Sequence, residues 1–176
     1  MKLLAFAASN SRESINKQLV TYAASLVPGA DVEIIDLNDF ELPLFSVDRE
    51  QELGQPELAK LFLSKIAAAD GLLISFAEHN MSFTAAWKNL YDWCSRIETK
   101  VYQGKPTVMI STSPGGRGGA NVLEAALKSA PFFGAEIKGS LAIPSFNENF
   151  DVDQGRLGND ELDKQLRDVV TELAQP

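Results

Sequence analysis

Apolar segments of strand length alternate along this chain with longer segments in which apolar residues recur at helical spacing. The strand-like segments cover residues 2–7, 31–36, 71–76, 106–112 and 136–143, and the helix-like segments cover residues 14–27, 56–69, 84–97 and 119–132. Regular alternation of strands and helices is typical of a parallel sheet whose two faces are covered by helices. The sequence therefore predicts a doubly wound α/β fold.

Residue spacing within these segments supports the assignment. The apolar residues expected on one helix face are Leu58, Leu61, Phe62 and Ile66 in the second helix, and Trp87, Leu90, Tyr91 and Cys94 in the third. A further helix near the C-terminus is marked by Leu162, Leu166, Val169, Val170 and Leu173. The strands "GLLISF" and "TVMIST" are apolar almost throughout, as expected for strands buried on both faces.

Length and charge limit the classes to which the chain can belong. It has 176 residues without a repeat or linker-like tract, so we expect one domain over residues 1–176. A net charge of -8 and the lack of a basic run argue against nucleic acid or an anionic membrane surface as a partner. No apolar stretch approaches the roughly 20 residues of a membrane helix. Residues 1–7 lack the features of a secretion signal and Cys94 is the single cysteine, so we expect a cytoplasmic protein.

Two long stretches show no periodic pattern, residues 37–55 and residues 144–158. Long irregular connections in a compact domain usually serve a function or lie at an interface. We expect both stretches to lie near a ligand or a partner subunit, with a plain surface loop as the alternative.

The turn after the first strand is rich in groups that bind anions. In "ASNSRESIN" the hydroxyls of Ser9, Ser11 and Ser14, the Asn16 amide and the Arg12 guanidinium precede a helix. The free N–H groups and the dipole at a helix N-terminus favour negative charge, so we expect a phosphate there. The alternative is simple helix capping, with Asn10 or Ser11 as the N-cap and Glu13 reaching back to it.

The turns after the third and fourth strands lie at the same edge of the predicted sheet. In "AEHNMSFT" the only histidine, His79, stands between Glu78 and Asn80. In "STSPGGRGGAN" the glycines allow the backbone to approach a ligand closely, with a flexible loop as the alternative. This glycine turn is not a Walker A loop, and it misses the dinucleotide fingerprint because Asn121 stands where the last glycine should be.

The three turns together resemble those of the NADPH-dependent FMN reductase family, which includes quinone, chromate and azo-dye reductases. The family's first turn reads Gly-Ser-x-Arg-x-x-Ser-x-Asn, and Ser9, Ser14 and Asn16 match it in register. Ala8 replaces the glycine, and Ser11 occupies the arginine position with Arg12 one step later.

The second and third turns extend the resemblance, which covers residues 1 to about 143. The second turn and the helix after it match the family at Glu78, Asn80, Ser82, Lys88, Asn89, Asp92 and Trp93, and depart from it at Ala77, His79 and Thr84. The third turn, "SPGGRGG", is similar to the family's Ser-x-x-Gly-x-x-Gly-Gly flavin loop.

The resemblance implies a flavodoxin-like three-layer α/β/α fold with a five-stranded parallel sheet in the order 2-1-3-4-5. It implies FMN, with its phosphate on the first turn and its ring against the loops at 77–83 and 113–119. The residues expected to bind the cofactor are Ser9, Ser11, Arg12, Ser14, Ile15, Asn16, Ala77, Glu78, His79, Asn80, Ser113, Pro114, Gly115, Gly116, Gly118 and Gly119.

The implied activity is hydride transfer from NADPH or NADH to FMN and then to a small acceptor such as a quinone, a flavin, an azo compound or a metal oxyanion. No side chain is required as an acid or a base, so we name no catalytic residue. Arg117 is either a contact for the 2′-phosphate of NADPH or a solvated loop residue. The family forms homodimers and homotetramers, with Trp87, Tyr91 and Trp93 suited to an interface or, alternatively, to the core.

Other classes fit the residues less well. A flavodoxin-like electron carrier shares the fold and is the main alternative. A phosphoacceptor domain needs an aspartate after the third strand, where this chain has Ser75 and Phe76. A serine hydrolase needs a histidine base in a late segment, and no histidine occurs there. One histidine, one cysteine and scattered carboxylates give no metal-ligand spacing.

Overall fold

The computed structural model describes residues 1–175, which form a five-stranded parallel sheet in the order β2-β1-β3-β4-β5. The strands are β1 (Lys2–Ala8), β2 (Asp31–Ile35), β3 (Gly71–Phe76), β4 (Pro106–Thr112) and β5 (Glu136–Ile143). The predicted order is confirmed, and each predicted strand boundary lies within one residue of the observed one.

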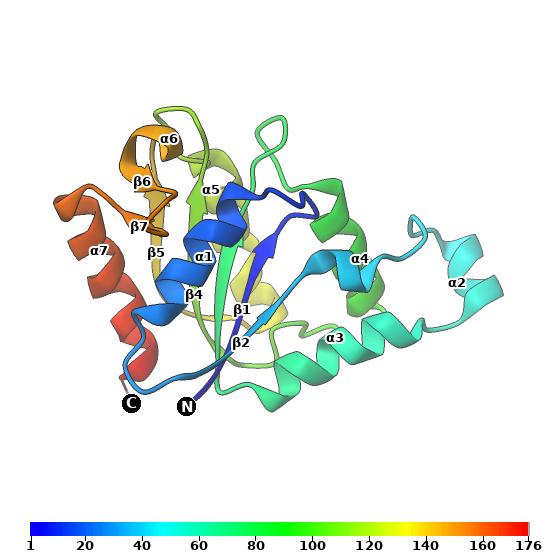
Figure 1. The fold of residues 1–176 in the computed structure, drawn as a ribbon. Coiled ribbons are helices and arrows are strands. Elements are labelled where there is room, and N and C mark those ends of the chain that lie inside the picture. The colour runs from blue at the N-terminus through cyan, green and yellow to red at the C-terminus, as the bar shows by residue number, and fades with distance from the viewer. Residues whose placement is uncertain (176) are drawn as a thin grey trace.

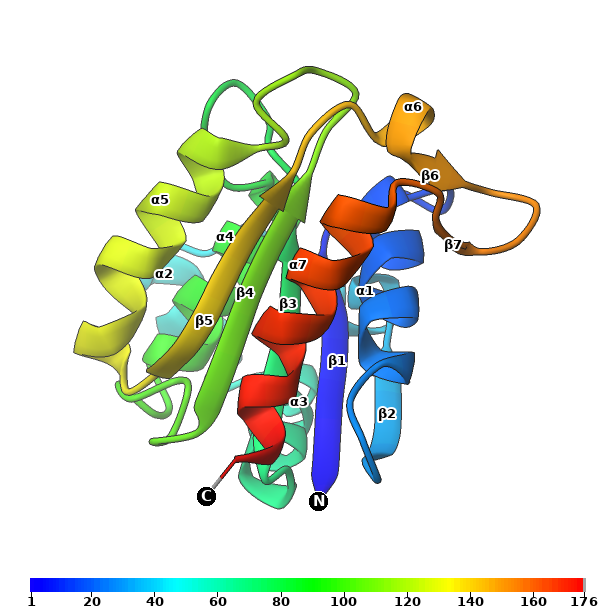
Figure 2. The ribbon, with the colours of Figure 1, turned by 90° about the vertical axis from the view of Figure 1, so that its left-hand side faces the viewer.

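Helices cover both faces of the sheet (Figures 1 and 2). One face carries α1 (Ile15–Ser25) and α7 (Asp160–Thr171), and the other carries α3 (Glu57–Ala68), α4 (Ala85–Ser95) and α5 (Ala120–Ser129). These are the five helices expected from the spacing of apolar residues. Two short 3-10 helices, η2 (Ala130–Phe133) and η3 (Glu172–Ala174), follow α5 and α7. No helix within residues 1–175 is both long and apolar enough to cross a membrane.

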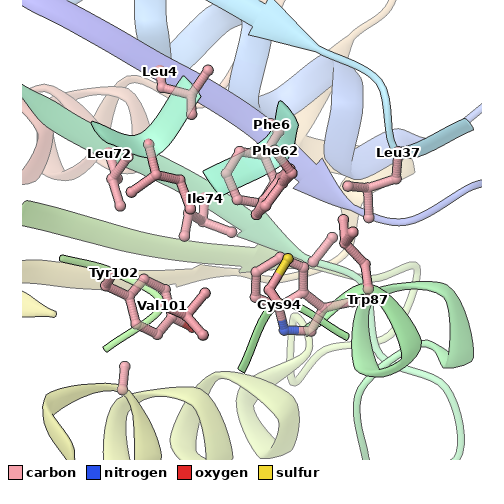
Figure 3. Close-up of a cluster of buried hydrophobic side chains, with 14 of the residues drawn as sticks. Leu4, Phe6, Leu37, Phe62, Leu72, Ile74, Trp87, Cys94, Val101 and Tyr102 are labelled. Atoms are coloured by element: carbon pink, nitrogen blue, oxygen red, sulfur yellow. The ribbon is translucent and has the colours of Figure 1, made fainter. Parts of the chain in front are cut away.

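The core lies on both sides of the sheet because successive strand residues point to opposite faces. On β1, Leu4 and Phe6 pack with α3 and α4, whereas Leu3 and Ala5 pack with α1 and α7. Figure 3 shows part of the first cluster, in which Phe62 meets Phe6 edge-on at a centroid distance of 5.5 Å. The central strands β1, β3 and β4 are thus sandwiched between two apolar layers, as the continuous apolar runs of β3 and β4 predicted.

The structure corrects one predicted helix face and decides between core and interface for two tryptophans. Leu61 is 47% exposed, and the inward positions of α3 are held by Ala59, Phe62, Leu63 and Ile66. Trp87 and Trp93 are 2% and 1% exposed within the chain itself, so they belong to the core rather than to an interface.

The two stretches without a periodic pattern are not structureless. Residues 37–55 hold η1 (Leu37–Phe40) and α2 (Val47–Leu53), and residues 144–158 hold α6 (Phe146–Asn149) and a hairpin of β6 (Phe150–Asp151) and β7 (Arg156–Leu157). The expectation of irregular backbone was wrong because these elements are too short to show a period. No residue of α2 is buried, and the helix lies at the side of the molecule, apart from the sheet (Figure 1).

The segment that leads to α2 is held against α4 by two residues that matched the family pattern. The Asn89 side chain donates to the carbonyls of Leu42 (3.0 Å) and Pro43 (3.1 Å) and accepts from the Phe45 N–H (2.8 Å). The indole of Trp93 donates to the Pro43 carbonyl at 2.7 Å. These two side chains therefore serve the fold and fix the start of the α2 arm, which we define as residues 41–54.

Candidate functional site

The three turns identified from the sequence meet at one edge of the sheet. Since β1, β3 and β4 are parallel neighbours, the turns that follow them lie side by side at the top of the molecule in Figure 1. They enclose a cleft of about 210 Å³. Its lining consists of Ser9, Ser11, Glu13, Ser14, Ile15, Asn16, Ala77, Glu78, His79, Thr112, Ser113 and Pro114.

The first turn presents the N-terminus of α1 to this cleft. Ser14 is the N-cap, and its hydroxyl accepts from the Lys17 N–H at 3.2 Å. The alternative of a cap at Asn10 or Ser11 was wrong. Within residues 1–175, no protein oxygen accepts the N–H groups of Ile15 and Asn16. Those two donors are therefore available to an anion in the cleft.

The Asn16 side chain has a different role from the one predicted. It is 2% exposed, donates to the Thr112 carbonyl (3.1 Å), and accepts from the Thr112 N–H (3.1 Å) and the Ser75 hydroxyl (2.8 Å). The amide thus ties the start of α1 to β3 and β4. Asn16 offers the cleft its backbone N–H rather than its amide.

The charged side chains of the lining are two carboxylates, Glu13 and Glu78, and neither a lysine nor an arginine is part of it. Arg12 is exposed on the same turn and does not line the cleft. An anion bound here would therefore be held mainly by N–H groups and by the hydroxyls of Ser11 and Ser14.

The second turn is a tight hairpin turn. The N–H of His79 donates to the Ser82 carbonyl and the N–H of Ser82 to the His79 carbonyl, both at 3.0 Å. Asn80 and Met81 at its tip have φ values of 52° and 65°, as a type I′ turn requires. The His79 side chain is exposed and lines the cleft, whereas Asn80 lies at the tip and does not.

The third turn holds two pairs of glycines that differ in burial and in the space around them. Gly118 and Gly119 are buried with φ of +59° and +76°, and a Cβ on Gly118 would lie 2.5 Å from the Ile143 carbonyl oxygen. Gly115 and Gly116 are exposed, and a Cβ on Gly116 would meet nothing within 4 Å. Only the outer pair therefore leaves its backbone open to a ligand.

Predicted and observed linings overlap but do not coincide. Ser113 and Pro114 line the cleft, while the four glycines of the third turn lie beyond it. Glu13 and Thr112 line it and were not predicted. Thr112 ends β4, so the rule that ligands bind at the carboxyl ends of strands would have found it.

The residues present fit FMN. Two free N–H groups and the hydroxyls of Ser11 and Ser14 suit a phosphate, and the backbones of 77–79 and 113–116 flank the space where a planar ring would lie. No group of metal-binding side chains occurs within residues 1–175.

Comparison with known proteins agrees with this arrangement. The family model described as NADPH-dependent FMN reductase matches residues 1–148. A 2-hydroxy-1,4-benzoquinone reductase of a Burkholderia species is 40% identical over 122 residues, which cover 68% of this chain and 64% of that protein, just under two thirds. An NAD(P)H-dependent FMN reductase of Pseudomonas aeruginosa is 31% identical over 178 aligned positions, covering 99% of this chain and 92% of that protein.

Among solved structures, the flavoenzyme NAD(P)H:(acceptor) oxidoreductase FerB from Paracoccus denitrificans superposes with a TM-score of 0.81. It is 23% identical in sequence, and the match covers 98% of this chain and 94% of that one. At this level of identity the likeness speaks for the fold, which is that of the flavodoxin-like proteins.

Proposed function

The chain belongs to the NADPH-dependent FMN reductase family, and from this premise we propose that it is an FMN-dependent NAD(P)H oxidoreductase acting on a small acceptor. When bound, FMN would take a hydride from NADPH or NADH and pass the electron pair to that acceptor. A quinone is the acceptor class we favour, because the Burkholderia relative is named for a benzoquinone. Flavins, azo compounds and metal oxyanions are the other small acceptors that we propose.

One observation carries the proposal: the family's three motif turns line one cleft, and the first of them leaves two helix N-terminal N–H groups without a protein acceptor in the described chain. We assign the phosphate to Ser9, Ser11, Arg12, Ser14, Ile15 and Asn16. We assign the ring to the backbones of residues 77–79 and 113–116. The protein's part is to bind and orient the cofactor, so no side chain is named as an acid or a base.

Binding of FMN can be compared with binding of riboflavin, which lacks the phosphate. Each charge-assisted hydrogen bond to the phosphate contributes about 1.5–3 kcal/mol, so we expect FMN to bind at least ~100-fold more tightly than riboflavin. Quenching of flavin fluorescence measures both dissociation constants. Equal affinities for FMN and riboflavin would show that the first turn does not bind the phosphate.

We further propose that residues 1–176 form a single FMN-binding domain that assembles as a homodimer or homotetramer. The α2 arm supports a partner copy, because α2 buries no residue within the chain and Leu44, Val47 and Leu53 are 70%, 57% and 56% exposed. The only cysteine is a buried thiol, which suits a reducing compartment such as the cytoplasm.

A further inference from the structure

Helix α5 begins without a capping side chain of its own. Its N-cap is Gly119, which has no side chain to accept the N–H groups of the first turn. The carboxylate of Glu78 takes this place from the loop after β3: it accepts from the Val122 N–H at 2.9 Å and from the Asn121 amide at 3.2 Å. A residue 44 positions away in the chain therefore caps the helix.

This contact distinguishes the two helix N-termini near the cleft. At α5 the Glu78 carboxylate already neutralises the positive end of the helix dipole and satisfies a free donor. At α1 the matching N–H, that of Lys17, is capped by the neutral hydroxyl of Ser14, and the N–H groups of Ile15 and Asn16 have no acceptor within residues 1–175. An anionic group would therefore be drawn to α1, and α5 would not compete for it.

The same carboxylate also orients the glycine turn. Because the Asn121 amide donates to Glu78, its oxygen faces the other way and accepts from the Arg117 guanidinium at 2.9 Å. On its far side the glycine turn is held by the N–H groups of Ser145, to the Gly115 carbonyl, and Phe146, to the Ser113 carbonyl, both at 3.0 Å. Glu78 supplies the matching restraint on the side of the β3 loop.

We propose that Glu78 is a positioning residue: it sets the spacing between the 77–80 loop and the glycine turn, and thereby the alignment of the flavin ring, without its carboxylate contacting the cofactor. This inference rests on the proposed function, since it needs a flavin between those loops. It replaces the sequence-based expectation that Glu78 is itself a ligand.

The test compares Glu78→Ala and Glu78→Gln with Asn159→Ala. Asn159 is a matched control because its side chain caps α7 in the same way, accepting from Glu161 and Leu162 at 3.2 Å, outside the cleft. In the flavin-free protein, we expect amide exchange at Val122 to accelerate about tenfold in Glu78→Ala, as a lost cap predicts, and to stay unchanged in Asn159→Ala.

With FMN bound, we expect Glu78→Ala to change the affinity less than about threefold, because the phosphate site on α1 is intact. The anaerobic rate of flavin reduction by NADPH should fall about tenfold or more, since a misplacement near 1 Å costs up to ~100-fold. Glu78→Gln, which keeps one acceptor oxygen, should lie between.

Three results overturn the proposal: a wild-type reduction rate in Glu78→Ala, an equal loss in Asn159→Ala, or loss of FMN with unchanged exchange at Val122, which would make Glu78 a direct ligand. Failure of the proposed function looks different. In that case the wild-type protein itself binds no FMN, and the positioning role is excluded as well. Amide exchange at Val122 still shows whether Glu78 caps α5.

Discussion

Ser14 shows how a single side chain can serve the fold and the site together. Its hydroxyl caps α1 and also lines the cleft. Capping orients the first turn of the helix, so the N–H groups of Ile15 and Asn16 point to the place where a phosphate is expected. The anion site and the cap are therefore two results of the same local geometry.

We predict that Ser14→Ala lowers the free energy of unfolding by about 1 kcal/mol, as for other lost N-caps, and also weakens FMN binding. Ser46→Ala is the matched control, because Ser46 caps α2 through the Arg49 N–H at 3.1 Å and does not line the cleft. Denaturant unfolding and flavin fluorescence measure the two effects. Equal FMN affinity in Ser14→Ala and the wild type would exclude the hydroxyl from the site.

Cys94 is expected to be unreactive for a reason that also lies at the residue scale. The thiol is 0% exposed, and burial raises its pKa from the ordinary 9.0 to about 12. Since the raised pKa favours the protonated thiol in the folded state, its contribution to stability is complete below pH 9.0 and is lost as the pH rises towards 12.

We predict that a thiol reagent modifies Cys94 at pH 8 only after denaturation, because the reactive thiolate is both scarce and covered. The measurement is the labelling rate with and without denaturant. Rapid labelling of the native protein would show that α4 opens far more readily than its packing implies.

At the scale of elements, the glycine turn separates residues that the fold needs from residues that a ligand needs. Gly118 cannot carry a side chain, because its Cβ would lie 2.5 Å from the Ile143 carbonyl oxygen and its φ is positive. Gly116 has open space around it and no such restriction. A flavin ring is expected to occupy that space.

We predict that Gly118→Ala lowers the free energy of unfolding by about 2–4 kcal/mol through overpacking and backbone strain. Gly116→Ala should leave stability nearly unchanged and weaken FMN binding. Thermal unfolding and flavin titration of both variants make the test. If Gly116→Ala bound FMN as the wild type does, the ring would have to lie elsewhere.

The central strands and helices could be predicted from the sequence because their apolar residues recur regularly over long segments. The strands are apolar almost throughout, and helices such as α4 show several turns of consistent spacing. The four-residue α6 and the two-residue strands β6 and β7 are too short to show a period. The seven-residue α2 has no buried face to mark it.

The sequence predicted where the candidate cleft lies, but not the contacts of every residue in it. Strand order brings the three turns together, and that order follows from the motifs. The roles of Asn16 and Glu78 depend on partners 96 and 44 positions away, Thr112 and Val122. Such contacts leave no local signal in a sequence, so both residues were expected to touch the ligand.

At the scale of the whole molecule, the α2 arm is the part least explained by a single chain. Leu53 is 56% exposed on a helix with no buried residue. We predict that Leu53→Glu shifts the protein to a smaller assembly in sedimentation velocity, because a carboxylate would be buried without a partner at an interface. Phe132→Glu, at an exposed site on η2, serves as the control. An unchanged mass for Leu53→Glu would exclude the arm from the interface.

The most direct test of the central claim is an anaerobic visible spectrum of the protein, loaded with FMN and freed of excess, before and after addition of NADPH. The account predicts a flavin spectrum that survives the separation and bleaches with NADPH. Retained flavin that does not bleach would indicate an electron carrier on the same fold. Absence of retained flavin would contradict the assignment of the cleft.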